Sequence, residues 1–388
     1  MRSPERVLNS LNEHSKDSSY KFERLYRLLF NEELFYVAYQ KIASNGGSTT
    51  KGSDGRSIDG MSLARIETLI ASLKDESYQP HPSRRVHIPK KNGKTRPLGI
   101  PAFEDKLVQE VVRMILEAIY EGHFETTSHG FRPKRSCHTA LLHIQKTFNG
   151  AKWFIEGDIK GFFDNIDHDV LVGILRERIS DDRFIRLIRK FLKAGYVEDW
   201  TFHNTYSGTP QGGIVSPILA NIYLDKLDKY VKEYIQHFDK GTKRRPGKES
   251  NNLANERKRT VRKLKKVKDG TEKAALVARL KAIEQERAAF PNGDEMDESY
   301  RRLKYIRYAD DFILGVIGSK EEAQRIKEDI KSFLSASLAL ELSEEKTLIT
   351  HTGKSAKFLG YEITVTRDNH QRRDVRGCLR RTYGKRVR

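Results

Sequence analysis

Two adjacent aspartates set between two short apolar runs limit the folding of this chain more than any other feature. Asp310 and Asp311 lie in the stretch YIRYADDFILG, residues 305–315. Each flanking run is short enough to be a β-strand, so we predict a hairpin with both carboxylates at its tip. Adjacent carboxylates repel each other, and burying even one unpaired charge is costly. Because aspartate also favours turns for its own hydrogen bonds, an ordinary turn is the alternative.

A third carboxylate makes a metal site the better interpretation. Asp158 ends an apolar run in FIEGDIKGFFD, residues 154–164. Adjacent strands of one sheet could bring Asp158 within reach of Asp310. Three carboxylates gathered at strand ends would repel strongly unless divalent cations lay among them. Mg²⁺ prefers such oxygen ligands and accepts substrate phosphates as further ligands, and two such ions can activate a hydroxyl and stabilise a leaving phosphate oxygen.

The excess of basic residues favours a polyanionic partner. The 388 residues include 72 Lys and Arg against 53 Asp and Glu, which gives a net charge of +19. A surface with this charge attracts polyanions, and nucleic acid is the leading candidate. A basic scaffold of the ribosomal kind is the alternative.

Cysteine usage and hydropathy exclude several classes of protein. The two cysteines, Cys137 and Cys378, lie far apart, which excludes a disulfide framework and a Cys-rich zinc module and suits a reducing compartment. No zinc-type histidine spacing and no P-loop motif occurs. No apolar run approaches the length of a membrane span, and residues 1–20 lack the apolar core of a signal peptide. We therefore expect a soluble intracellular protein with no membrane partner.

Residue periodicity predicts a mixed α/β protein with a sheet-based core. Helical spacing of apolar residues predicts helices at 22–42, 105–120, 136–148 and 320–338. Strands are predicted at 84–101 (a hairpin turning at Asn92-Gly93), at 153–159 and as a pair around 347–365. Glycine-rich segments predict loops at 44–60 and 207–213. Residues 239–300 are polar and highly charged, and residues 367–388 are basic and should contribute little core.

Six sequence blocks, taken in order, resemble those of reverse transcriptases. They include DIKGFFD, SGTPQGGIVSPILANIYLDKLD, YIRYADDF and KFLGYEI. Two further blocks, IPKKNGKTRPLGIPAFEDKLVQ and HGFRPKRSCHTAL, make the chain similar to the reverse transcriptases of group II intron-encoded proteins, the maturases. The resemblance runs from about residue 20 to residue 366. YADD alone is a weak signal, but six blocks in order are highly specific.

The resemblance implies an α/β (α+β) right-hand polymerase fold with fingers and palm. Members of the family normally continue into a helical thumb, which we expect to be absent here. The expected divisions are an N-terminal extension with the start of the fingers (1–83), fingers (84–150), the first part of the palm (151–238), a basic helical insertion (239–300), the rest of the palm with the YADD hairpin and primer grip (301–366), and a basic tail (367–388).

The resemblance also implies a set of catalytic and metal-binding residues. Asp158, Asp310 and Asp311 would hold two Mg²⁺ ions, for which Mn²⁺ can substitute, and the carbonyl of Ile159 would complete the ligand set. Lys346 matches a lysine proposed to protonate the departing pyrophosphate.

Further positions match residues that hold the nucleotide and the primer. Lys90 and Arg96 match finger residues that bind the incoming triphosphate, although a solvated basic hairpin is the alternative. Phe163 matches the aromatic residue that excludes ribose 2′-hydroxyls, and a core phenylalanine is its alternative. Gln211 matches a residue that contacts the nucleotide beside the primer end. Leu359 and Gly360 should form the primer grip.

The charged insertion contains an unmixed basic run at residues 257–268. Val261, Leu264 and Val267 could form a thin apolar stripe on a helix, but like charges one turn apart should make the isolated helix fray. A solvated helix or a disordered loop is the ordinary reading of such a run. We predict instead that it contacts intron RNA phosphates and orders on binding. Its basic residues are Arg257, Lys258, Arg259, Arg262, Lys263, Lys265, Lys266 and Lys268.

Two functional classes follow from the resemblance. The first is an enzyme, an RNA-directed DNA polymerase that uses an RNA template, a DNA primer and deoxynucleoside triphosphates. The second is a binding module that holds intron RNA and assists splicing and retrohoming. Retron, diversity-generating and CRISPR-associated polymerases are the alternatives within the enzyme class. Without a thumb, we also expect a weak homodimer, and we expect the protein in the bacterial cytoplasm or nucleoid.

Overall fold

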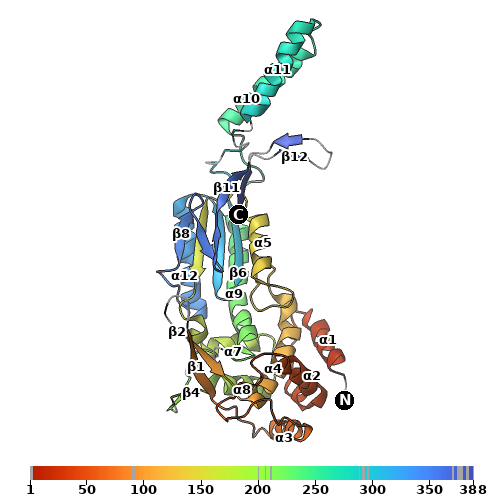
Figure 1. Cartoon of the computed structure of the whole chain (residues 1–388), viewed down its shortest axis with the longest axis vertical. Coiled ribbons are helices and arrows are strands. Elements are labelled where there is room, and N and C mark those ends of the chain that lie inside the picture. The colour runs from red at the N-terminus through yellow and green to blue at the C-terminus, as the bar shows by residue number, and fades with distance from the viewer. Residues whose placement is uncertain are drawn as a thin grey trace. The chain divides into compact units, whose positions relative to one another are not determined.

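The chain folds into two compact units, each built from several segments of the sequence. A computed structural model describes residues 3–89, 93, 95–199, 201–205, 207–209, 212–287, 289–290, 293–294, 297–368, 371–373, 379–381 and 384–387. The first unit comprises Met1–Ser136, Ile159–Lys229 and Lys331–Ser343, and the second Cys137–Asp158, Tyr230–Ile330 and Glu344–Arg388. Helices α9 (Ser216–Phe238) and α12 (Lys320–Leu338), which are labelled in Figure 1, contribute residues to both units.

A central helix organises the first unit. Helix α4 (Phe103–Tyr120) is buried on most of its surface and packs against helices α1 (Pro4–Ser15) and α2 (Glu32–Ala43). The remaining helices of this unit are η1 (Tyr26–Phe30), α3 (Leu63–Lys74), η2 (Glu121–His123), α6 (Phe162–Asn165), α7 (His168–Arg176) and α8 (Asp182–Lys193). The helix predicted at 105–120 is thus confirmed, with its start at Phe103.

The single helix predicted over residues 22–42 is wrong. Phe22 forms a β-bridge with Ile179, a short 3₁₀ helix follows, and α2 begins only at Glu32. The side chain of Asn31 accepts a hydrogen bond from the backbone N–H of Glu33, which caps a new helix start. The apolar spacing on both sides of Asn31 hid this break.

The first unit also holds a four-stranded sheet of order β2-β1-β4-β5. Strands β1 (Ser83–Pro89) and β2 (Thr95–Ile100) form the predicted hairpin. Gly93 has the positive φ of +77° that a tight turn favours, whereas Asn92 lies outside the described residues. Strands β4 (Tyr196–Glu198) and β5 (Thr201–His203) were not predicted, because three-residue strands carry almost no periodicity.

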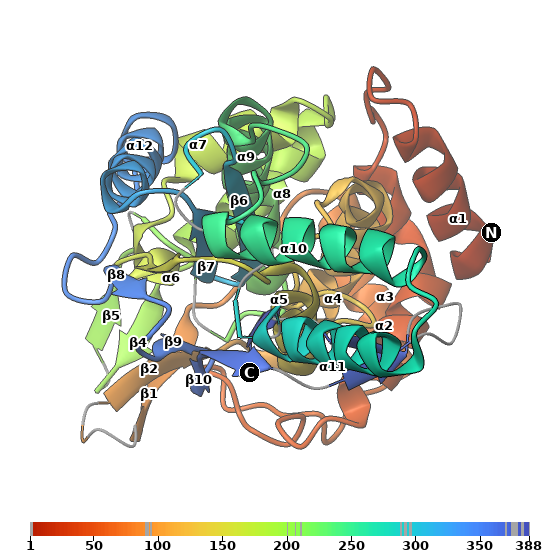
Figure 2. The same ribbon diagram turned by 90° about the horizontal axis from the view of Figure 1, so that it is seen from above.

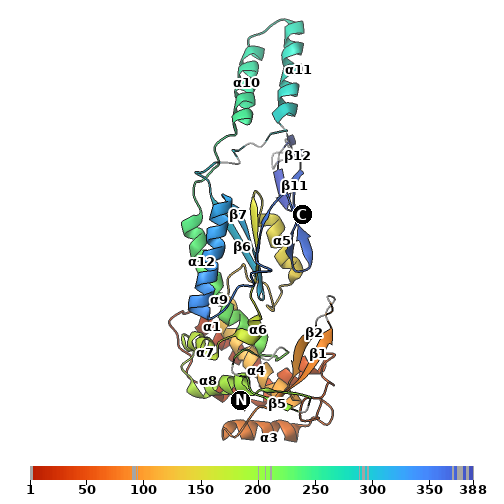
Figure 3. The ribbon, with the colours of Figure 1, turned by 90° about the vertical axis from the view of Figure 1, so that its left-hand side faces the viewer.

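The second unit is built on an antiparallel sheet of order β6-β7-β3-β8. Its strands are β6 (Arg302–Tyr308), β7 (Asp311–Ile317), β3 (Trp153–Asp158) and β8 (Leu348–His351). The YADD hairpin and the strand at 153–159 are therefore confirmed. Helix α5 (Cys137–Thr147) packs against β6, and its Ile144 joins a buried cluster with Phe148 and Phe154 (Figure 3).

Short hairpins follow β8 and reach the end of the chain. Strands β9 (Ala356–Phe358) and β10 (Tyr361–Ile363) pair with each other, as do β11 (Val365–Asp368) with β14 (Gly384–Val387) and β12 (Gln371–Arg373) with β13 (Leu379–Arg381). Val387 is buried in the core cluster of this unit. The expectation that residues 367–388 contribute little core is therefore wrong at this position.

The charged insertion forms a helical hairpin. Helices α10 (Lys248–Leu264) and α11 (Gly270–Arg287) lie side by side (Figure 2). Arg257 is paired with Glu284 at 2.5 Å, and Arg279 with Glu256 at 2.6 Å, so acidic residues offset part of the like-charge repulsion within α10. The structure thus gives the basic run a partner helix where we expected an isolated, fraying one. No helix in the described parts of the chain has the length and apolar character needed to cross a membrane.

Gly157, on β3, provides the first test of this packing. A Cβ atom built there would lie 2.2 Å from the ring of Phe312, which is fully buried on the neighbouring strand. We expect Gly157→Ala to lower the free energy of unfolding by about 1–3 kcal/mol, because the ring has no room to move. Denaturant titration measures this change.

Gly173 is the matched control, because a Cβ atom there meets nothing within 4 Å in helix α7. Gly173→Ala should leave stability unchanged or raise it by up to about 1 kcal/mol. Equal effects of the two substitutions would contradict the packing described for β3 and β7.

Candidate active site

The strand register of the second unit brings two of the predicted carboxylates together. Strands β3 and β7 are antiparallel, and Asp158 lies directly opposite Asp311. Asp310 immediately precedes β7, in the two-residue connection from β6, where Ala309 has a φ of +56°. The sequence prediction that Asp158 lies on a strand adjacent to the YADD hairpin is therefore confirmed.

A buried arginine fixes the turn that carries these aspartates. The side chain of Arg307 is fully buried, and its Nη1 donates a hydrogen bond of 2.8 Å to the carbonyl of Ala309. A buried guanidinium needs such acceptors. Sequence reasoning missed Arg307, although a cation directly between Ile306 and Tyr308, next to the two aspartates, is a recognisable signal.

The carboxylates are close enough to affect each other's ionisation. Burial, and then the charges of Asp310 and Asp158, raise the pKa of Asp311 to about 7, although Lys346 acts in the opposite direction. Near neutral pH this carboxyl therefore tends to keep its proton unless another positive charge approaches.

Lys346 supplies one positive charge to the site. Its Nζ donates hydrogen bonds to both carboxylate oxygens of Asp158, at 3.1 and 2.9 Å. This bond is the main reason that the pKa of Lys346 is raised. The lysine that we predicted to be catalytic is therefore hydrogen-bonded to a carboxylate that we predicted to bind metal.

The donor set fits a hard divalent cation. Among the residues that the structure describes, no three His, Cys, Asp or Glu side chains are already arranged as a metal-binding group. Asp158 and Asp311 nevertheless face each other, with Asp310 beside them, and the ammonium of Lys346 and the tendency of Asp311 to stay protonated both reflect a local excess of negative charge. A cation bound by carboxylate oxygens would relieve that excess.

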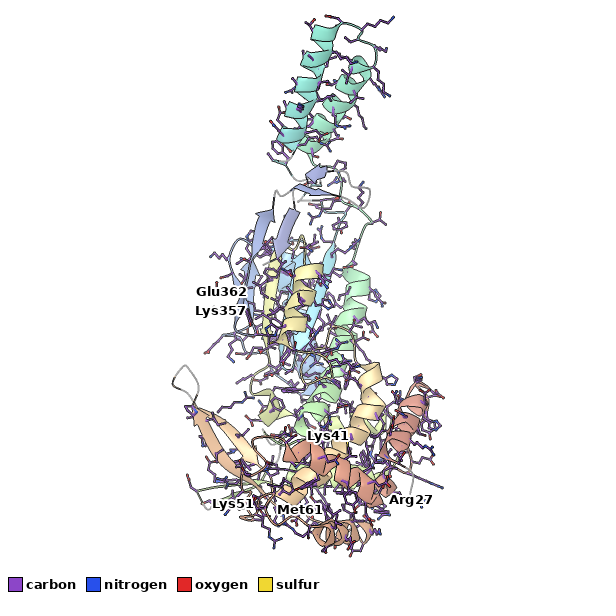
Figure 4. All side chains as sticks on the ribbon, turned by 45° about the vertical axis from the view of Figure 1, so that its right-hand side comes forward. Arg27, Lys41, Lys51, Met61, Lys357 and Glu362 are labelled. Atoms are coloured by element: carbon purple, nitrogen blue, oxygen red, sulfur yellow. The ribbon has the colours of Figure 1, made fainter. Side chains whose placement is uncertain are left out.

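One cleft joins this pair to the predicted primer grip. Asp158, Asp311, Lys346 and Leu359 all line it. Leu359 and Gly360 form the turn between β9 and β10, with φ values of +53° and +79°, as in the two-residue turns that suit hairpins. In this hairpin Lys357 and Glu362 are directly paired across the strands (Figure 4).

Glu156 connects strand β3 to that hairpin, and sequence reasoning missed it. It lies two residues before Asp158 and is buried. Its Oε1 accepts a hydrogen bond of 2.5 Å from the hydroxyl of Thr350, and its Oε2 accepts one of 2.8 Å from the backbone N–H of Lys357. A carboxylate inside an apolar run was the available signal.

The first unit places other predicted residues around a separate cavity. Phe163 lines it together with Pro97 and Gly99 of the β1–β2 hairpin and with Gly208 and Thr209. The Phe163 carbonyl accepts a hydrogen bond of 2.7 Å from the N–H of Thr209. A Cβ atom at Gly208 would lie 2.5 Å from that carbonyl, so this close approach requires glycine.

Phe163 is largely buried, at 9% exposed, and contacts the rings of Phe131 and Phe162. This burial is also what the alternative interpretation, a core phenylalanine, predicts. Arg96 is exposed on β2. Lys90 and Gln211 lie outside the described residues.

The structure also describes the positions of Ile159 and of the basic run 257–268. Ile159 is buried and forms a β-bridge with Leu342 in the first unit. In the basic run, all eight Lys and Arg side chains are exposed. Arg257 pairs with Glu284, and none of the other seven makes an ion pair with a residue that the structure describes.

Several known proteins are similar to this chain in sequence. The family described as "Reverse transcriptase (RNA-dependent DNA polymerase)" matches residues 88–244 and 287–363. The group II intron-encoded protein LtrA of Lactococcus lactis subsp. cremoris is 52% identical over 363 residues, covering 93% of this chain and 60% of its own. Protein YkfC of Escherichia coli is 36% identical, covering 91% of this chain and 86% of its own.

A yeast relative is similar over nearly the same share of this chain. The putative COX1/OXI3 intron 1 protein of Saccharomyces cerevisiae is 38% identical, covering 93% of this chain and 41% of its own. The chain thus spans about three fifths of LtrA and less of the yeast protein. The family match covers more than half of the chain, and the mixed helix-and-sheet structure is that of a polymerase with fingers and palm. This chain belongs to the reverse transcriptases of group II intron-encoded proteins.

Proposed function

We propose that this chain is an RNA-directed DNA polymerase that also binds intron RNA to assist splicing and retrohoming. The observation that carries the proposal is the register that sets Asp158 opposite Asp311, beside Asp310, in a cleft that Lys346 and Leu359 also line. Residues 151–238 and 301–366 would form the palm. Two of the relatives are bacterial, and we propose the same setting, the cytoplasm or nucleoid of a bacterium.

Asp158, Asp310 and Asp311 would hold two Mg²⁺ ions, or Mn²⁺ in their place, with the Ile159 carbonyl as a further ligand. When bound, such ions activate the primer 3′-hydroxyl and stabilise charge on the leaving phosphate oxygen. The carboxylates supply the negative charge that attracts these ions and fix where they bind. The substrates would be an RNA template, a DNA primer and deoxynucleoside triphosphates.

Lys346 would deliver a proton to the departing pyrophosphate. Its hydrogen bonds to Asp158 hold the protonated ammonium beside the proposed metal ligands, where a proton donor is needed. Glu156 positions the turn of Leu359 and Gly360, which would hold the primer end in the same cleft.

Residues of the first unit would bind the incoming nucleotide. Arg96 and Lys90 would contact its triphosphate, and Gln211 the nucleotide itself. Phe163 would exclude a 2′-hydroxyl, because its ring lines the cavity beside the glycine-rich turn.

The exposed basic face of α10 supports the RNA-binding part of the proposal. Four exposed cations of the run on α10 and three more just after its end have no described ion-pair partner, which leaves them available to phosphates. Intron RNA is the partner that we propose for this face.

The carboxylates provide the direct test of the enzyme. We expect Asp158→Asn and Asp310→Asn each to reduce primer extension on an RNA template with Mg²⁺ by about three orders of magnitude or more. Thermal unfolding should show little loss of stability, because each change removes a charge that repels the neighbouring carboxylates and the Lys346 pair that Asp158→Asn weakens is exposed on the lysine side. Glu328→Gln, an exposed change on α12, is the control and should extend primers normally. Near-normal extension by either Asp variant would refute the assignment.

Glu156 is tested through the primer. In Glu156→Gln, one of the two accepting oxygens becomes an amide N–H₂, which then faces a hydrogen-bond donor. Losing that hydrogen bond should cost about 1–3 kcal/mol. We expect a several-fold higher KM for primer–template with a smaller change in kcat, and faster hydrogen exchange at the Lys357 amide. Thr350→Val removes one donor and keeps the branched shape, so its effect should be smaller. An unchanged KM together with unchanged exchange would leave Glu156 a core residue only.

Phe163 is tested through sugar selectivity. Phe163→Val should raise the incorporation of ribonucleotides relative to deoxyribonucleotides by about tenfold or more, because the smaller side chain leaves room for a hydroxyl. The matched control is the neighbouring Phe162→Val, since Phe162 is buried against Tyr223. Phe162→Val should lower stability without changing the ratio, and the same pattern in Phe163→Val would show that Phe163 is core.

The basic helix is tested through salt dependence. Changing Lys258, Arg259, Lys263 and Lys266 to Ser should flatten the dependence of intron RNA affinity on salt by up to about three units in log–log slope. Arg257→Ser is the control, because Arg257 is already paired with Glu284 and should change the slope less. Extension of a short primer–template should persist in both. An unchanged slope in the fourfold variant would make this helix an ordinary solvated one.

A further inference from the structure

The second half of helix α9 carries an aromatic ladder that the polymerase chemistry does not use. Tyr230, Tyr234 and Phe238 recur every four residues, with ring centroids 6.1 and 6.4 Å apart. Tyr234 and Phe238 line a cavity of about 390 Å³ in the second unit. His237, Lys240, Arg301, Glu322 and Arg325 complete its lining.

The tyrosines of the ladder are held in place by α12. The hydroxyl of Tyr234 donates a hydrogen bond of 2.8 Å to the Asp329 carboxylate, and that of Tyr230 contacts the Asp329 carbonyl at 3.5 Å. Burial raises the pKa of Tyr234, so its hydroxyl keeps the proton that it donates. The Tyr234 ring is thereby fixed at the cavity wall.

The acidic groups around the cavity are already engaged. Glu322 pairs with Arg301 at 2.7 Å and also accepts from the N–H of Ser319. Asp329 accepts from Tyr234, and Asp239 accepts from the N–H of Leu303. Among the described residues, each of these carboxylates is held by another donor, and none forms an ion pair with Lys240 or Arg325.

The remaining cations of the lining are exposed and have no such partner. Lys240 and Arg325 make no ion pair or side-chain hydrogen bond with any residue that the structure describes. His237, beside them, is also exposed. An aromatic wall rimmed by uncompensated positive charge is a poor site for a neutral apolar molecule and a good one for an aromatic anion.

We propose that this cavity binds one unpaired nucleotide of an RNA strand, with its base against Tyr234 and Phe238 and its phosphate on Lys240 and Arg325. Aromatic side chains that stack unpaired bases, together with cations that hold the backbone, are the usual means of binding single-stranded RNA. The inference rests on the proposed function for the class of ligand. It concerns a site separate from the carboxylate cleft, since the two linings share no residue.

Binding of a labelled uridine hexamer to the full chain, by fluorescence anisotropy, tests the base contact. Phe238→Leu should weaken the binding about fivefold to a hundredfold, because it keeps an apolar side chain and loses the stacking face. Phe238→Trp should retain the affinity. An abasic oligonucleotide of equal length has no base to stack, so its affinity for the Phe238→Leu variant should equal its affinity for the parent chain. Unchanged hexamer affinity in Phe238→Leu would overturn the proposal.

The phosphate contact is tested by a charge-matched pair of variants. The double change Lys240→Ser and Arg325→Ser should weaken the binding of both the uridine hexamer and the abasic oligonucleotide. Removing the same charge in Lys146→Ser with Lys320→Ser should have a smaller effect, because those exposed residues line none of this cavity. Equal losses in the two double variants would mean that only net charge matters, against the proposal.

Crosslinking locates the base independently of affinity. A hexamer containing 4-thiouridine, irradiated on the parent chain, should label the peptide that holds Tyr234 and Phe238. Labelling confined to other peptides would overturn the proposal. Primer extension measured on the same samples separates this inference from the proposed polymerase activity. Active polymerase without a label on this peptide would refute the cavity proposal alone. A parent chain that is labelled on this peptide but inactive would refute the polymerase proposal alone.

Discussion

The pairing of β3 with β7 is the interaction on which the candidate active site depends. Side chains alternate between the faces of a sheet, so a slip of one residue would move Asp158 away from Asp311 and bring a side chain against the Phe312 ring. Only Gly157 fits under that ring, and this contact therefore fixes the register as well as the packing. The same strand carries Glu156, which accepts one hydrogen bond from Thr350 on β8 and one from the backbone N–H of Lys357 on β9, and so ties the β9–β10 hairpin to β3.

That geometry concentrates negative charge in a place where water screens it poorly. The fold tolerates the concentration because Lys346 neutralises Asp158 and the raised pKa of Asp311 lets that group stay neutral. Both compensations are reversible, since an ammonium can move aside and a proton can leave. A site arranged in this way favours cations without needing them in order to fold.

Much of the fold could be predicted from the sequence, because long periodic segments carry a strong signal. The helix near 105–120 and the YADD hairpin were predicted correctly, and so was the proximity of Asp158 to the hairpin. The break at Asn31 and the three-residue strands β4 and β5 were missed, since capping and short strands depend on neighbours that periodicity does not reveal. Glu156, Arg307 and Val387 belong to this second kind, because long-range packing decides their burial. The roles of individual site residues came from the family resemblance and stay predictions.

The helical hairpin of α10 and α11 has one more consequence, which comes from how it is joined to the sheet. Lys240 and Arg301 exchange two backbone hydrogen bonds of 3.1 Å, so the insertion begins after helix α9 and ends before strand β6 at one pair of bonded residues. With the ends already closed, the length of what lies between affects the closure entropy only logarithmically. Residues 242–299 are therefore a replaceable insertion. A related chain could carry an insertion of another length or chemistry at this point. An engineer could replace it with a short glycine-containing turn, and the register of β3, β6 and β7 should not change.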